Sequence, residues 1–330
     1  MLNRRRFVKA ALGGGIASGV WPSTKWAHAQ TIAKPARLIA GFPPGGTIDA
    51  VARLLVEQMK GYAPSLIVDN RPGAGGRIAL DALKGSDADG SVMALTPGDQ
   101  LTLFPHIYNR LTYKPLEDFR PVTTVCSVQF LLTVGPLVPA NVKSLADFIA
   151  WARGNPAAAN YGTAGAGTRP HFLGVTLARA ANLAFVHLPY KGNPQAVQDL
   201  LGGQVAANFS TISNTLAQVQ AGTLRALATT APRRGGALPD VPTFKELGYS
   251  ELEAVEWFGI LVPARTPANA VAALHTAVRE AVRTAAFNMG LTRLSLESVD
   301  SSPSDLAELI KVETQRWAGI VDAVGFKPLE

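Results

Sequence analysis

Two glycine-containing loops carry the residue types best suited to hold a small anion. The first reads Phe42-Pro-Pro-Gly-Gly-Thr-Ile-Asp49 and joins an apolar run over 38–42 to a stretch with helical apolar spacing. Gly45 and Gly46 have no side chain that would keep a ligand off the backbone, and the first amides of the following helix lack an intrahelical partner. The loop has neither the lysine of a P-loop nor the G-x-G-x-x-G order, so a small carboxylate is favoured over a nucleotide phosphate.

The second loop reads Thr163-Ala-Gly-Ala-Gly-Thr168 and again lies between a predicted strand and a predicted helix that runs to about residue 182. Two such loops that face each other across a cleft would grip one ligand from both sides. A charge-assisted bond from a backbone amide to a carboxylate contributes about 1.5–3 kcal/mol, so three or four give roughly micromolar binding. The alternative, that each loop is an ordinary turn of an α/β protein, stays open.

Three further candidates each have a structural alternative. The loop Arg71-Pro-Gly-Ala-Gly-Gly-Arg77 follows a predicted strand and could bring Gly75 to the same cleft edge. Arg77 could donate two parallel hydrogen bonds to a carboxylate, or it could be a solvated helix cap. Asp49 could accept a bond from a ligand hydroxyl or ammonium, or it could cap its own helix start.

The remaining candidates lie in the second half of the chain. His171 could donate to a ligand, or it could bond to its own loop. Phe209 and Ser210 stand at the end of a predicted strand, where the serine offers a hydroxyl. Tyr190 could close the rim of the cleft.

Signals of an enzyme or of a metal site are weak. The chain has no G-x-S-x-G, no H-E-x-x-H and no Cys-x-x-Cys, and its histidines at 106, 171, 187 and 275 are scattered. The single cysteine, Cys126, lies in an apolar run, which favours a buried, inert thiol over a catalytic one. We therefore expect no catalytic residue, no metal ion and no cofactor.

Strand and helix patterns alternate along most of the chain, which predicts an α/β protein with largely parallel sheets. Strands are predicted over 66–69, 91–96, 185–188, 205–209 and 224–230, and helices over 78–83, from the capping box at Ser144 and Asp147, over 193–201 and over 214–221. The region 102–124 reads as a connecting loop that Tyr108 and Tyr113 anchor.

Two long apolar strands, over 122–134 and 256–262, predict a hinge. About 300 residues exceed what one core usually holds, so two domains are expected. The chain would leave the first domain near residue 130 and return near residue 255, which assigns 30–130 plus 254–330 to domain I and 131–253 to domain II. A helix over 267–287 and a closing helix that Ser302 caps would be scaffold.

The first 29 residues have the pattern of an export signal. Arg4-Arg-Arg-Phe-Val-Lys9 resembles the twin-arginine type, the apolar run over 10–20 is too short to span a bilayer, and Ala27-His-Ala29 fits a cleavage site. The alternative is a basic amphipathic anchor that stays attached. Export with cleavage would place the protein in the periplasm.

Net charge argues against nucleic acid as a partner. The whole chain has 31 basic and 24 acidic residues, a net charge of +7. The predicted signal holds five of the basic residues and none of the acidic ones, so the rest has 26 against 24, or +2. A nearly neutral chain lacks the basic surface of a nucleic-acid-binding protein.

An ordered set of motifs resembles the Bug family, the TctC-like periplasmic solute-binding proteins of tripartite tricarboxylate transporters. The motifs are Phe42-Pro-Pro-Gly-Gly46 with Asp49 and Arg53, Asn70-Arg-Pro-Gly-Ala-Gly-Gly76, Asp118-Phe-Arg-Pro-Val122, Tyr161 to Thr168 with His171, Leu188-Pro-Tyr-Lys-Gly192, and Ala221 to Ala228. The resemblance implies a type II periplasmic-binding-protein fold, in which a two-strand hinge joins two α/β domains around a ligand cleft. It also implies a small carboxylate ligand held by backbone amides and ordered water.

The resemblance assigns the family's carboxylate loops to particular residues of this chain. These are Phe42, Gly45, Gly46, Thr47 and Asp49 in the first domain, and Thr163, Gly165, Gly167 and Thr168 in the second. Two features depart from the family pattern. Arg77 stands where a small or polar residue is common, and 84–90 lacks the usual proline-containing turn.

The expected function is therefore capture of a small mono- or dicarboxylate, or an amino acid, for a membrane permease of the tripartite tricarboxylate type. We expect a monomer that performs no reaction. One alternative on the same fold is a ligand receptor for a signalling partner. Another is a periplasmic hydrolase or transferase, which would need a nucleophile and a base that converge in the cleft.

Overall fold

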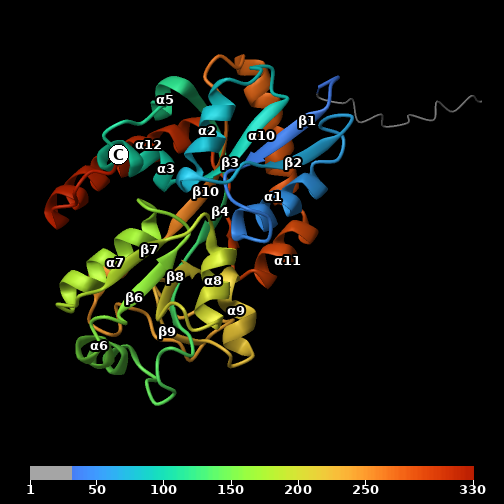
Figure 1. The fold of residues 1–330 in the computed structure, drawn as a ribbon. Helices are drawn as coiled ribbons and strands as arrows, with labels where there is room; N and C mark the ends of the chain where they lie inside the picture. Colours follow the sequence, from blue (N-terminus) through green and yellow to red (C-terminus); the bar gives the residue numbers. More distant parts are fainter. Residues whose placement is uncertain (1–31) are drawn as a thin grey trace, which may run out of the picture.

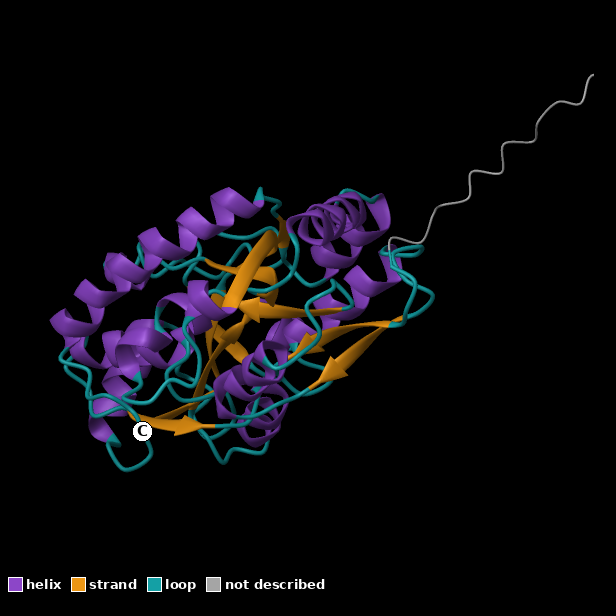
Figure 2. Ribbon diagram, turned by 90° about the horizontal axis from the view of Figure 1, so that it is seen from above, coloured by secondary structure: helices purple, strands orange, loops and turns teal. Residues whose placement is uncertain are grey.

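The computed structural model describes residues 32–330, so the predicted export signal over 1–29 lies outside the described residues. The chain forms two lobes, each built on its own β-sheet (Figure 1). Lobe I holds a six-stranded sheet with the order β11-β4-β10-β3-β1-β2, and lobe II holds a five-stranded sheet with the order β7-β6-β8-β5-β9. Helices flank the strands (Figure 2), so the predicted α/β class with two sheets is confirmed. The prediction of largely parallel sheets is wrong, because each sheet also contains antiparallel pairs, such as β10 with β3 and β5 with β8.

Lobe I begins with a parallel α/β unit. Its elements are β1 (Ala36–Ala40), α1 (Thr47–Gln58), β2 (Leu66–Asn70), η1 (Ala74–Gly76), α2 (Arg77–Lys84) and β3 (Val92–Pro97). Strand β1 pairs in parallel with both β2 and β3. The carboxyl ends of these strands therefore meet at one edge of the sheet, where the loops before α1, η1 and α3 (Asp99–Thr102) begin.

Lobe II repeats the alternation of strand and helix. Its elements are β5 (Phe130–Val134), α6 (Leu145–Gly154), β6 (Asn160–Thr163), α7 (Arg169–Ala180), β7 (Val186–Pro189), α8 (Asn193–Leu201), β8 (Ala207–Thr211), α9 (Ile212–Gln220), β9 (Arg225–Thr229) and η2 (Ser250–Leu252). Strand β6 is parallel to β7 and β8, whereas β5 is antiparallel to β8 and β9. The predicted capping box of α6 is confirmed, since Ser144 and Asp147 bond to each other's backbone amides.

Two segments connect the lobes. β4 (Phe119–Val128) belongs to the sheet of lobe I and β5 to the sheet of lobe II, and only Gln129 lies between them. The prediction of a single strand over 122–134 is therefore wrong, because this segment forms parts of two strands that belong to different sheets. The chain returns at Ala254, whose amide donates to Thr230 of lobe II, and then enters β10 (Glu256–Pro263) between β3 and β4.

Two other predictions need correction. The region 102–124 is not a plain loop, because it holds α4 (Phe104–Ile107), α5 (Pro115–Asp118) and the start of β4; Tyr108 and Tyr113 are buried as predicted. The single helix expected over 267–287 is two helices, α10 (Ala268–Val282) and α11 (Ala285–Arg293). They are separate because Thr284 has extended backbone angles and its side chain caps α11 by accepting from the amide of Phe287.

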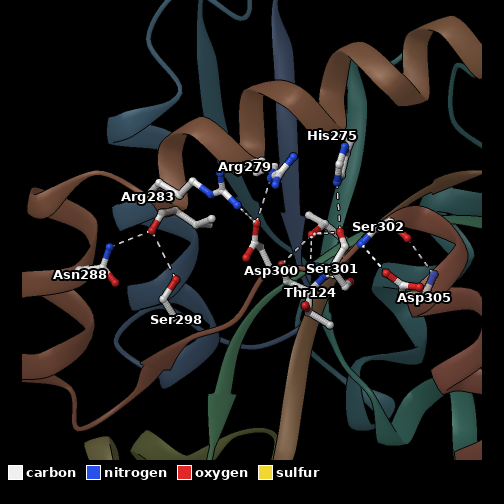
Figure 3. Close-up of polar contacts among 12 residues, drawn as sticks. Thr124, His275, Arg279, Arg283, Asn288, Ser298, Asp300, Ser301, Ser302 and Asp305 are labelled. Atoms are coloured by element: carbon white, nitrogen blue, oxygen red, sulfur yellow. Dashed lines mark hydrogen bonds and ion pairs between the residues drawn. The ribbon is translucent and has the colours of Figure 1, made fainter.

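The segment before the last helix holds lobe I together (Figure 3). The Ser301 hydroxyl accepts from the amide of Thr124 at 3.0 Å, and the Ser301 carbonyl accepts from His275 Nε2 at 3.0 Å. Arg279 and Arg283 both bond to Asp300. These contacts join β4 and α10 to the short strand β11 (Glu297–Ser298) and to α12 (Pro303–Val324), which confirms a scaffold role for this region.

Helix α12 packs on both lobes. Ser302 and Asp305 form its capping box, as predicted. Its Trp317 ring lies 5.7 Å from the ring of Phe172, which belongs to α7 of lobe II. Together with other apolar residues these form what we call the interlobe apolar cluster: Leu103, Phe104, Ile107, Tyr108, Phe172, Trp317 and Val321. No helix between residues 32 and 330 has both the length and the apolar character that a membrane crossing requires.

Candidate functional site

A cavity of about 50 Å³ lies between the two lobes. Its walls are largely apolar and come from both sheets and their loops: Phe42, Ile48, Pro97, Phe130, Ala164, Pro170, Pro194 and Phe258. Its polar side chains are Thr47, Asp99, Thr168, Asn193, Thr211, Asn214 and Glu256. A mostly apolar cavity with a few convergent polar groups is the usual form of a small-molecule site.

Helix α1 presents its N-terminus to this cavity. Thr47 and Ile48 are its first two residues and both line the cavity together with Gly46. Amides at these positions have no intrahelical partner, and the helix dipole places partial positive charge there. This end of the cavity is therefore suited to a carboxylate group.

Asp49 lies behind this helix start and is not among the residues that line the cavity. One carboxylate oxygen accepts from the amide of Gly45 at 3.0 Å and from Arg53 Nε at 2.9 Å, and the other accepts from Asn70 Nδ2 at 3.0 Å. Burial alone would raise the pKa of Asp49, but these hydrogen bonds outweigh it and hold the pKa below its ordinary value. The side chain thus fixes the 43–47 loop against α1 and β2, which is the structural one of its two predicted roles.

The second glycine loop uses many of its own amides internally. Gly165 donates to the hydroxyl of Thr163, and Gly167 donates to His171 Nδ1 at 3.0 Å. The amide of Arg169, the first residue of α7, donates to Asp99 Oδ2 at 2.9 Å. Of the loop residues predicted to bind the ligand, Thr168 lines the cavity, whereas Thr163, Gly165 and Gly167 lie behind it.

His171 belongs to its own loop, which is the structural one of its two predicted roles. An amide N–H only donates, so Nδ1 of this ring must be unprotonated. The ring stacks on His187 with centroids 3.7 Å apart, and burial lowers the pKa of His171 to about 4. His187 in turn bonds to the Thr163 hydroxyl at 2.7 Å, but Thr163 is fully buried and does not reach the cavity.

The other predicted residues are not among those that line the cavity. Phe209 and Ser210 are buried within β8, and their neighbour Thr211 lines the cavity instead. The Tyr190 hydroxyl donates to Asp199 at 2.8 Å. Arg77 donates to the carbonyl of Ala74, and its guanidinium lies 3.8 Å from the centre of the Tyr108 ring, so it is held by its own lobe.

Gly75 marks a close approach between the lobes. A Cβ atom built on Gly165 of lobe II would lie 3.2 Å from the Cα atom of Gly75 in lobe I. In the cavity wall, the Thr47 hydroxyl lies 2.5 Å from that of Thr211, and it also lies 2.6 Å from that of Ser213. The two lobes are therefore in direct contact around the cavity.

Sequence reasoning missed two acidic residues in the cavity wall. Asp99 is 2% exposed and Glu256 is 3% exposed, and the Asp99 amide donates to Glu256 Oε1 at 2.9 Å. Burial raises the pKa of both carboxyl groups, and for Glu256 the charge of Asp99 raises it further. The position of Pro97-Gly-Asp99 directly after a strand of the parallel sheet was the available signal, because strand ends at this edge carry ligand loops.

Arg169 faces this acidic pair from lobe II. Its Nε atom lies 3.6 Å from Glu256, and its Nη2 atom lies 3.6 Å from Glu313 of α12. The guanidinium also lies 4.9 Å from the centre of the Trp317 ring. Arg169 is 5% exposed, so this group is a buried ionic contact between the lobes.

The described residues offer no evident place for a metal ion. Across residues 32–330, no group of three or more histidine, cysteine, aspartate or glutamate side chains has the arrangement to hold one. Cys126 is fully buried in β4, which confirms the predicted burial, and this burial raises the pKa of its thiol well above the ordinary value.

Comparison with known proteins gives one consistent family. The model of the family described as "Tripartite tricarboxylate transporter family receptor" matches residues 51–326. Protein BugT of Bordetella pertussis is 34% identical over 301 residues, which are 89% of this chain and 90% of BugT. The structure of the periplasmic binding protein BugD has a TM-score of 0.85 at 28% identity and covers 90% of this chain and 99% of its own. R. palustris Rpa4515 with adipate has a TM-score of 0.84 at 28% identity, over 94% of this chain and 100% of its own.

Proposed function

The chain belongs to the tripartite tricarboxylate transporter receptor family, and we propose that it captures a small carboxylate in the periplasm and delivers it to a membrane permease of that transporter type. The family is one of receptors and not of enzymes. The observation that carries the proposal is the cavity between the lobes, into which α1 presents its free N-terminal amides.

The geometry accounts for binding without any chemical step. Amides of Thr47 and Ile48 would donate to the ligand carboxylate, and Gly46 lets the ligand approach the backbone. Closure of the two lobes excludes water, which strengthens each of these bonds. Rpa4515, whose fold this chain shares, is bound to adipate, which fits a carboxylate as ligand.

The wider assignment follows from the same premise. The division into 30–130 plus 254–330 and 131–253, with a hinge at the two connecting segments, is our proposal for the domains. The protein acts as a monomer with no cofactor, and its partners are the ligand and the permease. Export through the twin-arginine signal over 1–29 would bring it to the periplasm.

Isothermal titration against small organic acids and amino acids tests this function. We expect one acid to saturate one site per chain, and native mass spectrometry of protein purified without added solute should show a bound mass that identifies it. The proposal fails if no acid gives heat while ester or amide substrates are turned over. That result would favour a hydrolase or transferase instead.

A pair of variants tests the role of the α1 amides. Thr47→Pro and Thr47→Val both remove the hydroxyl, but only proline removes the amide hydrogen, and proline is well tolerated as the first residue of a helix. Loss of one charge-assisted bond of about 1.5–3 kcal/mol predicts that Thr47→Pro binds the acid roughly 10- to 100-fold more weakly than Thr47→Val. Equal affinities would show that this amide does not hold the carboxylate.

A further inference from the structure

The charge of the cavity wall bears on which carboxylate fits, an inference that rests on the function proposed above. Asp99 and Glu256 are the two ionisable side chains among the residues that line the cavity. Arg169 faces Glu256 but is not part of the lining. A ligand in the cavity therefore meets acidic groups at Asp99 and Glu256 and amide donors at the start of α1.

One oxygen of Asp99 has no partner within the protein. Oδ2 accepts from the amide of Arg169, whereas Oδ1 is buried and unpaired. Asn193, from α8 of the opposite lobe, also lines the cavity and leaves its own Oδ1 without a partner. Buried acceptor oxygens in native proteins are nearly always paired, so two of them at one cavity indicate that a donor belongs there.

We propose that the ligand is a small amino acid in its zwitterionic form, and that Asp99 and Asn193 accept hydrogen bonds from its ammonium group while the start of α1 holds its carboxylate. A plain dicarboxylate would place its second carboxylate beside Asp99, whose negative charge would repel it. An ammonium group supplies three donors and the opposite charge. Asp99 is thus the residue that sets specificity.

The dimensions of the cavity limit the ligand to a short chain. A volume of about 50 Å³ is room for roughly three to five water molecules, since each needs about 10–15 Å³ on this measure. Phe42, Phe130 and Phe258 close the sides with apolar surface that suits a short methylene chain. These limits favour the shortest amino acids over longer ones.

Matched ligand series test the proposal by isothermal titration of the full-length mature protein. One series is β-alanine, propionate and malonate, a second is 4-aminobutyrate, butyrate and succinate, and a third is L-alanine, L-lactate and propionate. In at least one series we expect the amino acid to bind at least tenfold more tightly than both of its partners. If in every series one of the acids without an ammonium group binds as tightly as the amino acid, the inference is wrong while the proposed function stands. If no acid of any kind binds, the proposed function itself has failed.

The variant Asp99→Asn tests whether Asp99 causes the preference for an amino acid over a dicarboxylate. The amide keeps an oxygen for the Arg169 amide but loses the negative charge, so the ratio of amino acid to dicarboxylate affinity should fall at least tenfold. Asp240→Asn, an exposed position with the same change of charge, should leave the ratio unchanged. If Asp99→Asn leaves the ratio of amino acid to dicarboxylate affinity unchanged, Asp99 does not set the specificity. If wild-type protein prefers the dicarboxylate and binds it more tightly at low pH, Asp99 is a protonated donor and the inference is also overturned.

Discussion

At the scale of single residues, the structure places most charged or titratable groups near the cleft in positions that support the fold. His171 and His187 are the clearest case. The bond from the Gly167 amide requires an unprotonated Nδ1 on His171, and the bond to the Thr163 hydroxyl fixes the orientation of the His187 ring. Burial lowers the pKa of His171 to about 4. Burial and then the neighbouring His171 lower the pKa of His187 to about 3. The stacked pair therefore stays uncharged while the protein is folded.

This pair predicts a loss of stability in mild acid. In the unfolded chain each histidine titrates near 6.5, so between about pH 6.5 and 4 the unfolded state binds more protons and the free energy of unfolding falls as pH falls. The double variant His171→Asn/His187→Gln keeps hydrogen-bonding atoms near Nδ1 and Nε2 but cannot titrate. From pH 7 to pH 5, urea unfolding should show the wild-type protein losing about 4 kcal/mol more than the variant, which is about 2 kcal/mol for each histidine. Parallel profiles would mean that the imidazoles are charged in the folded protein.

At the scale of elements, the site is built where loops from the two lobes meet. The 43–47 loop before α1 touches lobe II through Thr47, and the loop around Gly75 touches the loop around Gly165. Glycine at 165 has an ordinary backbone conformation, so its lack of a side chain matters for the approach of the lobes and not for its own loop. Closure of the cleft should therefore be sensitive to a single methyl group at this position.

Gly165→Ala tests this contact. The new Cβ atom would lie 3.2 Å from Gly75 in the closed arrangement but only at ordinary distance from Thr168 in its own lobe. We expect ligand affinity to fall roughly three- to tenfold, which corresponds to about 0.6–1.4 kcal/mol, with the stability of the free protein changed by less than about 0.5 kcal/mol. Gly154→Ala, where a Cβ atom meets nothing within 4 Å, is the control in the same titration. Unchanged affinity for both variants would show that the two loops do not meet when ligand is bound.

Local patterns in the sequence predict most of the elements and the positions of the two glycine loops, but not the breaks at Gln129 and Thr284 or the composition of the cavity wall. Strands that end in glycine loops before a helix can be recognised within about ten residues, which is why the 43–47 loop and the 163–168 loop were found. Asp99 takes the amide of Arg169, which lies 70 residues away, and Glu256 lies a further 87 residues along the chain. Only tertiary folding brings these groups together, and it is the reason that the second loop has fewer free amides than its glycines predict.

At the scale of the whole molecule, the two lobes form one packed body around the cleft. The interlobe apolar cluster joins α7 to α12, and Arg169 of α7 lies between Glu256 of β10 and Glu313 of α12. Buried ionic groups contribute little as an intact set, but removal of one partner leaves an uncompensated charge. The stability of the closed molecule should therefore depend strongly on Arg169.

Arg169→Met should destabilise the protein by about 3–5 kcal/mol near neutral pH, because it leaves Asp99, Glu256 and Glu313 without their buried cation. Burial already raises the pKa of Asp99 and Glu256 in the folded protein, and loss of the cation raises both pKa values further. As pH rises, these carboxyl groups therefore lose their protons in the unfolded chain at a lower pH than in the folded protein. The stability of the variant is thus lost as pH rises, and its deficit measured by urea unfolding should be smaller at pH 5 than at pH 7.5.

Two further variants separate this electrostatic effect from a loss of packing. Adding Glu256→Gln to Arg169→Met should restore part of the stability, because the buried charge that the arginine faced is then removed as well. Arg110→Met, at an exposed position, should change stability by less than about 0.5 kcal/mol. A deficit that is equal at both pH values, and that Glu256→Gln does not reduce, would show that Arg169 acts through its contact with Trp317 and not through its charge.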